Sequence, residues 1–251
     1  MVSERALMRW RVAGEIVLVV AAFFIFSGLI GLLFYRVNHG FEKEVLNAVL
    51  TPEGQQNLMQ AAFFAVPFAM FATLVVVDIL LRWRKLTLAD IGLRAPDSWQ
   101  RTLVYGIALG IGCYGIGVAI IFTLKQLGWT PPPSSFAFIR DNVIFYFFGM
   151  TAIAWFSGGF VEEVIFRGFF LGNLALLFGR GRLATPLAIL VQAAMFGALH
   201  ASTDILGVLP IFAMGLIFGW AYYAFGRNLW LLVSGHALYD NIGFTLLYWG
   251  A

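Results

Sequence analysis

Apolar stretches about as long as a membrane-spanning helix occupy most of this chain. A helix needs about 20 mainly apolar residues to cross the hydrocarbon core of a bilayer. Hydrophobic residues make up 61% of the 251-residue sequence and charged residues 12%, whereas soluble domains have about 45–50% and about 25%. The sequence therefore predicts an all-α fold, a polytopic membrane bundle of about eight transmembrane helices. The predicted spans are 16–35, 58–81, 103–124, 143–160, 161–178, 184–199, 206–225 and 229–249.

Two pairs of glycines bear on how these helices are arranged. Gly158 and Gly159 lie at the junction of the fourth and fifth spans, where a kink, a short turn or a re-entrant break are all compatible with the sequence. Gly106 and Gly110 have the Gly-x-x-x-Gly spacing that lets helices approach closely. We expect this second pair to serve packing within the chain.

Lys and Arg residues are distributed unevenly among the loops, which predicts the orientation. The N-terminal arm and the loop between the second and third spans carry eight of them, and the two intervening loops carry four. Cytoplasmic loops are the richer ones, so the N-terminus is predicted to be cytoplasmic. With eight spans, however, Arg180, Arg182 and Arg227 would face the other side. The eight are Arg5, Arg9, Arg11, Arg82, Arg84, Lys85, Arg94 and Arg101, and the four are Arg36, Lys43, Lys125 and Arg140.

The same distribution bears on partners. The net charge is +3, but the basic residues lie mostly at the ends of apolar stretches, where they meet anionic headgroups. No basic patch remains for a nucleic acid. Membrane lipids are therefore the expected surroundings of the chain.

Three ionisable residues lie together within one predicted span. Glu162, Glu163 and Arg167 belong to an otherwise apolar stretch, and an ionised side chain at such depth costs about 2.5 kcal/mol or more. Glu163 and Arg167 are four residues apart, in the favourable Glu-before-Arg order for a helical ion pair. Glu162 points about 100° away around an α-helix. We therefore expect Glu163 to pair with Arg167 and Glu162 to be catalytic.

Two histidines and further polar residues follow in the later spans. His200 ends one span, with Phe196 one turn before it, and His236 and Asp240 lie four residues apart in the last. We expect the Asp240 carboxylate to orient the His236 imidazole. A carboxylate beside an imidazole can take a proton from water, and a second imidazole or an Asx side chain can stabilise an oxyanion, so this set of residues suits hydrolysis.

Each group also has a purely structural explanation. A buried ion pair can fix packing, and a membrane histidine can be an interhelical hydrogen-bond donor. An ion or proton transporter would also place Glu and His in its spans. The first three spans contain almost no ionisable groups, however, and packing alone does not require two carboxylates, two histidines and an Asx to gather on three helices.

As a set, these residues resemble the signature of a known family. The pattern consists of Glu162-Glu163-x-x-x-Arg167, Phe196-x-x-x-His200 and His236-x-x-x-Asp240. It resembles the CAAX protease and bacteriocin-processing family of intramembrane proteases, also called the Abi family, over about residues 140–245. The last position is usually Asn in the family, and here Asp240 is followed by Asn241.

The resemblance implies an eight-span helical fold with a water-filled cavity. It assigns water activation to Glu162 and His200, and stabilisation of the tetrahedral intermediate to His236 and Asp240. Glu163 belongs to the same catalytic set, and Arg167, Phe196 and Asn241 would be structural or substrate-positioning residues. Glu162, His200 and His236 could supply three zinc ligands with one open position, as in a metalloprotease. A metal-free water activated by glutamate explains the residues equally well.

The resemblance also carries expectations about organisation and function. Residues 1–135 would supply N-terminal helices and loops, and residues 136–251 the catalytic helices, of one integral membrane domain. The expected activity is endopeptidase cleavage of membrane-associated or lipidated peptides, with the bacterial inner membrane as the expected location. The alternative is an inactive bacteriocin-immunity or scaffold protein of the same fold.

Overall fold

The computed structural model describes residues 4–40, 51–132, 134, 136–140, 142–179, 181–200 and 206–250, and over these ranges it contains helices and no strands. The predicted all-α membrane bundle is confirmed. Four helical segments are long and apolar enough to cross a membrane: Leu7–Asn38, Pro52–Trp83, Trp99–Gln126 and Val143–Phe178. The α-helices are α1 (Glu4–His39), α3 (Pro52–Trp83), α4 (Trp99–Gln126), α5 (Val143–Phe148), α6 (Leu171–Phe178), α7 (Ala184–Leu199), α8 (Val208–Ala224) and α9 (Leu229–Trp249).

The predicted fourth and fifth spans form a single helical segment. Between α5 and α6 lie η2 (Gly149–Glu162) and η3 (Val164–Phe170), and helical structure continues without a break from Val143 to Phe178. Gly158 and Gly159 are therefore neither a turn nor a re-entrant break. Both glycines are buried against α9, and because glycine has no side chain, the two helices can pack closely there. The described residues thus form seven helical segments, where the sequence predicts about eight.

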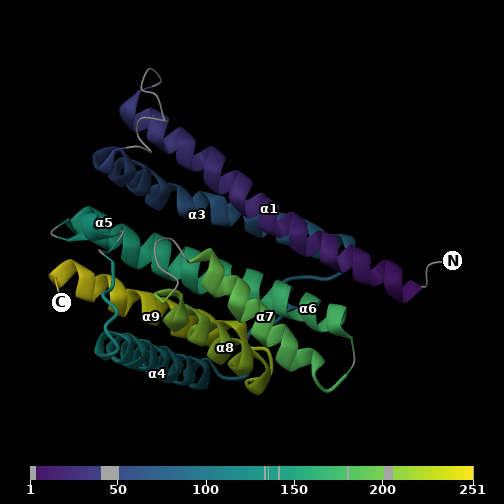
Figure 1. The fold of residues 1–251 in the computed structure, drawn as a ribbon. Helices are drawn as coiled ribbons and strands as arrows, with labels where there is room; N and C mark the ends of the chain where they lie inside the picture. The colour runs from purple at the N-terminus through teal and green to yellow at the C-terminus, as the bar shows by residue number, and fades with distance from the viewer. Residues whose placement is uncertain are drawn as a thin grey trace.

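Because the two predicted spans form one segment, the basic residues that follow α6 and α8 lie at the same end of the bundle as the start of α1. With an odd number of segments, α1 begins and α9 ends at opposite ends of the bundle (Figure 1). Arg227 lies at the same end as the loop between α3 and α4, because its Nη2 donates to the Asp90 carbonyl at 3.0 Å. The turn after α6 lies at that end too, since Gly179 is close to the Arg9 side chain. Lys43 and Arg180 lie outside the described residues.

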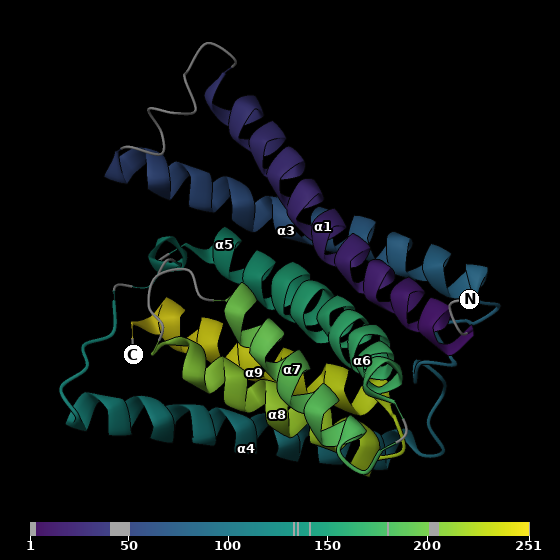
Figure 2. The ribbon, with the colours of Figure 1, turned by 45° about the vertical axis from the view of Figure 1, so that its right-hand side comes forward.

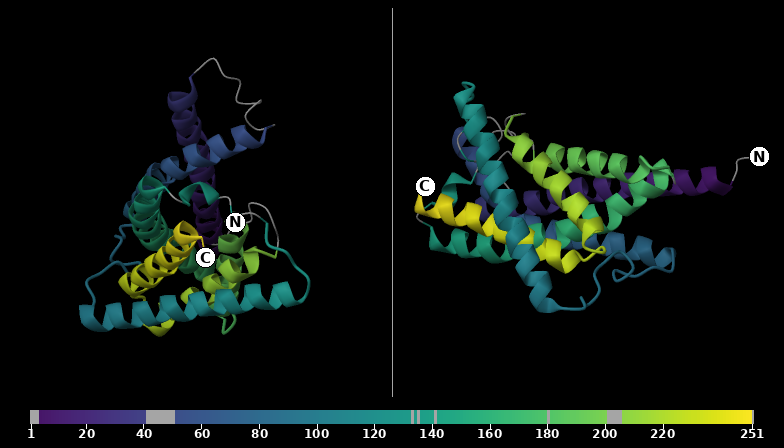
Figure 3. Two further views of the ribbon diagram at one scale, coloured as in Figure 1. Left: turned by 90° about the vertical axis from the view of Figure 1, so that its left-hand side faces the viewer. Right: turned by 90° about the horizontal axis from the view of Figure 1, so that it is seen from below.

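The helices form three layers. Helices α1 and α3 cross each other on one side, the Val143–Phe178 segment lies with α7, α8 and α9 in the middle, and α4 lies on the other side (Figure 2). Figure 3 shows the same order from a perpendicular direction, with α4 running under α8 and α9. Side chains at Gly106 and Gly110 of α4 would overlap Ser234 and Gly235 of α9. The Gly-x-x-x-Gly pair thus serves packing within the chain, as expected.

A polar network joins the α1–α3 pair to the middle layer at one end. Arg84, which follows α3, donates through Nε to Glu15 Oε1 of α1 at 3.1 Å and through Nη1 to Asn173 Oδ1 of α6 at 2.8 Å. Its Nη2 makes a further ion pair with Glu15. Both charges are nearly buried, so the network fixes three helices at this end.

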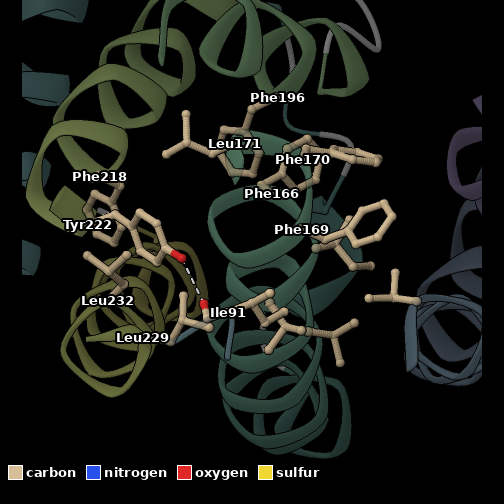
Figure 4. Close-up of a cluster of buried hydrophobic side chains, with 14 of the residues drawn as sticks. Ile91, Phe166, Phe169, Phe170, Leu171, Phe196, Phe218, Tyr222, Leu229 and Leu232 are labelled. Atoms are coloured by element: carbon tan, nitrogen blue, oxygen red, sulfur yellow. Dashed lines mark hydrogen bonds between the residues drawn. The ribbon is translucent and has the colours of Figure 1, made fainter. Parts of the chain in front are cut away.

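Phenylalanines fill the core beside the ionisable residues. Phe166 and Phe170 of η3 pack edge to face with ring centroids 5.4 Å apart, and Phe166 packs on Phe196 of α7 at 4.9 Å (Figure 4). Nearby, the Tyr222 hydroxyl of α8 donates to the Ile91 carbonyl at 2.8 Å. This bond anchors the loop that precedes α4 against the middle layer.

Candidate active site

The central helix is wound as a π-helix where it carries the site. Over Gly149–Glu162 and Val164–Phe170 its hydrogen bonds follow the i→i+5 pattern, which is rare and often marks a functional segment. Residues of a π-helix are spaced differently around the axis from those of an α-helix. The 100° separation expected between Glu162 and Glu163 therefore does not apply, because it assumed α-helical geometry.

Gly158 and Gly159 allow α9 to approach this helix. A Cβ atom on Gly158 would lie 2.5 Å from Asp240 Oδ2, and one on Gly159 would lie 3.0 Å from the Cβ of Ala237. A Cβ atom essentially never lies as close as 2.5 Å to another heavy atom, so a side chain at position 158 would force Asp240 to move. The two glycines therefore set the distance between the glutamates on the central helix and the polar residues on α9.

Glu163 links the central helix to α9. Its Oε1 accepts from Arg167 Nη1 at 2.8 Å and from His236 Nδ1 at 2.7 Å. Both Glu163 and Arg167 are 0% exposed. The spacing thus predicts the pair correctly, and the pair has a third member from another helix. Because a carboxylate only accepts hydrogen bonds, Nδ1 of His236 carries a hydrogen.

This geometry corrects the expected partner of His236. Asp240 Oδ2 lies 3.6 Å from His236 Nε2, which is too far for a hydrogen bond. Glu163 orients the imidazole instead, through the opposite ring nitrogen. The Nε2 edge therefore faces both Asp240 and Glu162 and is held by neither.

Arg167 is enclosed by aromatic rings. Its guanidinium carbon lies 4.5 Å from the Phe196 ring centroid and 5.3 Å from that of Phe218. Its Nε and Nη2 have no hydrogen-bond partner among the described residues. The charge is thus compensated by one carboxylate and two ring faces, which attract a desolvated cation.

Glu162 faces a cavity. Its Oε2 is buried and, within the described part of the chain, has no hydrogen-bond partner. This oxygen lies 4.0 Å from His236 Nε2. Glu162 and His200 both line a cavity of about 550 Å³. A carboxylate group that lines a cavity can accept hydrogen bonds from a water molecule there.

His200 contributes from the end of α7. Its Nδ1 lies 2.8 Å from the Phe196 carbonyl oxygen. A carbonyl can only accept, so Nδ1 carries the hydrogen and Nε2 is the basic nitrogen of the neutral ring. The Phe196 ring packs on the His200 ring with centroids 4.8 Å apart. Phe196 therefore contacts both Arg167 and His200.

The cavity walls are mostly apolar and come from distant parts of the chain. Val20 of α1, Met70 of α3 and Phe166 of the central helix line it, together with Trp129 and Pro131 from the segment after α4. The α1–α3 pair thus forms one wall and the central helix the other. An extended apolar chain fits this space better than a polar ligand does.

The remaining predicted residue, Asn241, follows Asp240 on α9. Its Oδ1 is buried and makes no hydrogen bond to any described residue. The structure therefore brings seven of the eight predicted residues into one connected cluster and leaves Asn241 beside it. The seven are Glu162, Glu163, Arg167, Phe196, His200, His236 and Asp240.

Phe218, Gly158 and Gly159 were not expected to shape the site. Phe218 is one of 26 phenylalanines, and no spacing distinguishes it, because its partner Arg167 lies on another helix. The glycine pair was noticed, but its closeness to Asp240 depends on how α9 packs.

Glu162, His200 and His236 are the residues that could supply zinc ligands. Among the described residues, no three His, Cys, Asp or Glu side chains come together as a ligand set. Zinc holds its ligands at about 2.0–2.3 Å, and in this arrangement Glu162, His200 and His236 do not converge on such a point.

Comparison with known proteins identifies the segment that carries these residues. No curated protein and no solved structure gives a significant match to the chain. Residues 144–242 match the family model described as Type II CAAX prenyl endopeptidase Rce1-like, and the three parts of the sequence pattern all lie inside this range. The match confirms the resemblance of this segment to the CAAX protease family.

Proposed function

We propose that the chain hydrolyses peptide bonds of membrane-associated or lipidated peptides, with Glu162 and His200 activating the attacking water. The family match supports an intramembrane protease. One observation carries the finer proposal: the side chains of Glu162 and His200 line the same apolar cavity. The residues that activate water and the space for a hydrophobic substrate are thus contiguous.

The reaction follows from the hydrogen-bonding capacity of each group. Glu162 takes a proton from water while the water oxygen bonds to the carbonyl carbon, and His200 Nε2 accepts a hydrogen bond from the same water. The carbonyl oxygen becomes an oxyanion, which accepts hydrogen bonds from His236 Nε2–H and from either the protonated carboxyl of Asp240 or the Nδ2 of Asn241. Glu162 then passes its proton to the amide nitrogen as the carbon–nitrogen bond breaks. The products are a carboxylate and an amine.

Glu163 and Arg167 position His236 in this scheme. With Nδ1–H held by Glu163, the Nε2 edge is fixed toward Glu162. For Nε2 to donate, the ring must be protonated, and an adjacent carboxylate favours that form. The Arg167 charge prevents Glu163 from taking the imidazole proton outright.

We further propose how the chain is organised in its membrane. Residues 136–251 would carry the catalytic helices and residues 1–135 would supply the opposite wall of the cavity. Arg182, Arg227 and the loop between α3 and α4 lie at the end where α1 begins, so this end would be cytoplasmic under the positive-inside rule. A bacterial inner membrane is the location that we favour.

The test is cleavage of a membrane-anchored peptide reporter in reconstituted vesicles. Glu162→Gln and His200→Ala should each lower kcat by at least about 100-fold, with unchanged thermal unfolding. Glu53→Gln, in the first turn of α3, is the matched control and should cleave normally. Full activity in both site variants would overturn the assignment. No cleavage by the unmodified protein of any reporter would favour the inactive immunity or scaffold alternative.

A substrate trap would identify what is cleaved. Glu162→Gln keeps the shape of the side chain but cannot take a proton from water. We expect it to retain bound substrate long enough for cross-linking and peptide sequencing. Recovery of the same peptides with His200→Ala, and not with the control, would support the assignment.

A further inference from the structure

A second cavity, separate from the site, lies where α4 and α9 begin. Its volume is about 590 Å³, and its lining differs from that of the first cavity because polar and charged residues contribute much of it. Arg94 and Arg101 line it, with Asp97 as the one acidic residue of the lining. Ser98 caps α4 and Asn228 caps α9 at its edge, so the amino ends of two helices border the same space.

The two arginines of this cavity are not neutralised by the protein. Other arginines at this end are engaged: Arg84 binds Glu15, and Arg227 donates to Tyr222 and to the Asp90 carbonyl. In the described ranges, the side chains of Arg94 and Arg101 make no ion pair and no hydrogen bond, and only the backbone N–H of Arg101 bonds to the Ser98 hydroxyl. Two uncompensated guanidinium groups and two helix amino ends favour an anion, since both carry positive charge or partial charge.

The other side of the cavity is apolar. Tyr105, Phe225 and Leu231 line it, and the Tyr105 ring packs on Phe225 with centroids 5.4 Å apart. Trp99 and Trp230 pair at the same level, and tryptophans are enriched where the headgroups meet the hydrocarbon. Trp99 is 51% exposed. The cavity therefore lies at the membrane surface, with a charged part and an apolar part.

We propose that this cavity binds the phosphate headgroup of an anionic phospholipid. The phosphate lies between Arg94 and Arg101, where planar guanidinium groups can hold its oxygens in pairs. The acyl chain passes Tyr105 and Leu231 and continues along the exposed apolar face of α4. The amphipathic lining distinguishes a lipid from a free phosphate, because a free phosphate uses only the charged part.

Thermal unfolding in a neutral detergent tests the proposal. Titration with phosphatidylglycerol should raise the unfolding midpoint, whereas phosphatidylcholine and inorganic phosphate should raise it much less. Each basic residue near an anionic headgroup contributes about a fivefold gain in affinity. Arg94→Gln/Arg101→Gln should therefore need roughly 25-fold more phosphatidylglycerol for the same shift.

A charge-matched control distinguishes lipid binding in this cavity from general electrostatic attraction of the lipid to this end of the protein. Arg82→Gln/Lys85→Gln removes two positive charges from the same end but outside the cavity, and it should keep the response of the unmodified protein. An equal loss in both double variants would overturn the site, as would an equal shift with phosphatidylcholine. An equal shift with inorganic phosphate would overturn the lipid assignment. Arg101→Gln alone provides a milder variant, for which about fivefold weaker binding is expected.

Discussion

The buried ion pair between Glu163 and Arg167 makes a quantitative prediction about stability. Both side chains are fully buried, and Glu163 is the carboxylate that pairs with Arg167, at 2.8 Å. Removing one partner of such a pair typically costs about 3–5 kcal/mol, because the remaining charge stays buried. We therefore expect Arg167→Met and Glu163→Gln each to lower the free energy of unfolding by about that amount.

The double variant should lose much less free energy of unfolding than the two single variants lose together. Glu163→Gln/Arg167→Met removes both charges of the pair together, the Gln oxygen can still accept from His236 Nδ1, and a Met side chain can pack between the Phe196 and Phe218 rings. Replacing a whole buried pair by neutral groups is often close to neutral. A coupling energy of about 2–3 kcal/mol is expected from the double-mutant cycle.

The assay is reversible unfolding by sodium dodecyl sulfate in mixed micelles, followed by circular dichroism. The matched control is the Asp78–Arg82 pair of α3, which has the same four-residue spacing but an Arg side chain that is 73% exposed. Its coupling energy should be much smaller, because solvent screens exposed charges. Additive losses in the Glu163–Arg167 cycle, or equal coupling in both cycles, would refute the reasoning.

The other predictions concern packing and catalysis. Gly158→Ala should lower kcat/KM at least about tenfold because its Cβ would displace Asp240, and unchanged kinetics would contradict the close contact. Asp240→Ala should lower kcat by about 100-fold, whereas Asp240→Asn, whose amide N–H can donate in place of the protonated Asp240 carboxyl, should stay within about tenfold of the unmodified protein. Chelator treatment should leave activity intact, because the described donors do not converge on one point, and loss of activity that zinc restores would show the opposite. Arg84→Met should lower the free energy of unfolding by about 3 kcal/mol, because it leaves Glu15 buried and unpaired, which the same micelle assay measures.

Apolar runs determine most of the fold, and their limits explain why one helical segment was predicted as two spans. The length and hydropathy of an apolar run are enough to locate a helix that is surrounded by lipid or by the protein core. The helices α1, α3 and α4 were therefore predictable from the sequence. They do not reveal whether Gly158 and Gly159 interrupt a helix. The answer depends on α9, which is far away in the sequence and packs into the space that the two glycines leave.

The site was predictable as a set of residues but not as a set of contacts. Spacing within one helix predicts the Glu163–Arg167 pair, because local geometry determines it. The same rule gave the wrong partner for His236. The hydrogen-bond partner of an imidazole can be a carboxylate from another helix instead of one four residues away, if packing brings that carboxylate closer. Here packing brings Glu163 Oε1 to 2.7 Å from His236 Nδ1.

The location of Glu163 and Arg167 on one helix has a consequence for biosynthesis. Their partners His236, Phe196 and Phe218 come from sequence that is synthesised later, so the helix enters the bilayer without them. Each isolated charge would then cost about 2.5–3.5 kcal/mol on the translocon scale. Because the two charges lie four residues apart, they can neutralise each other as soon as the helix forms. The helix can therefore be inserted during translation before the rest of the catalytic half of the protein exists.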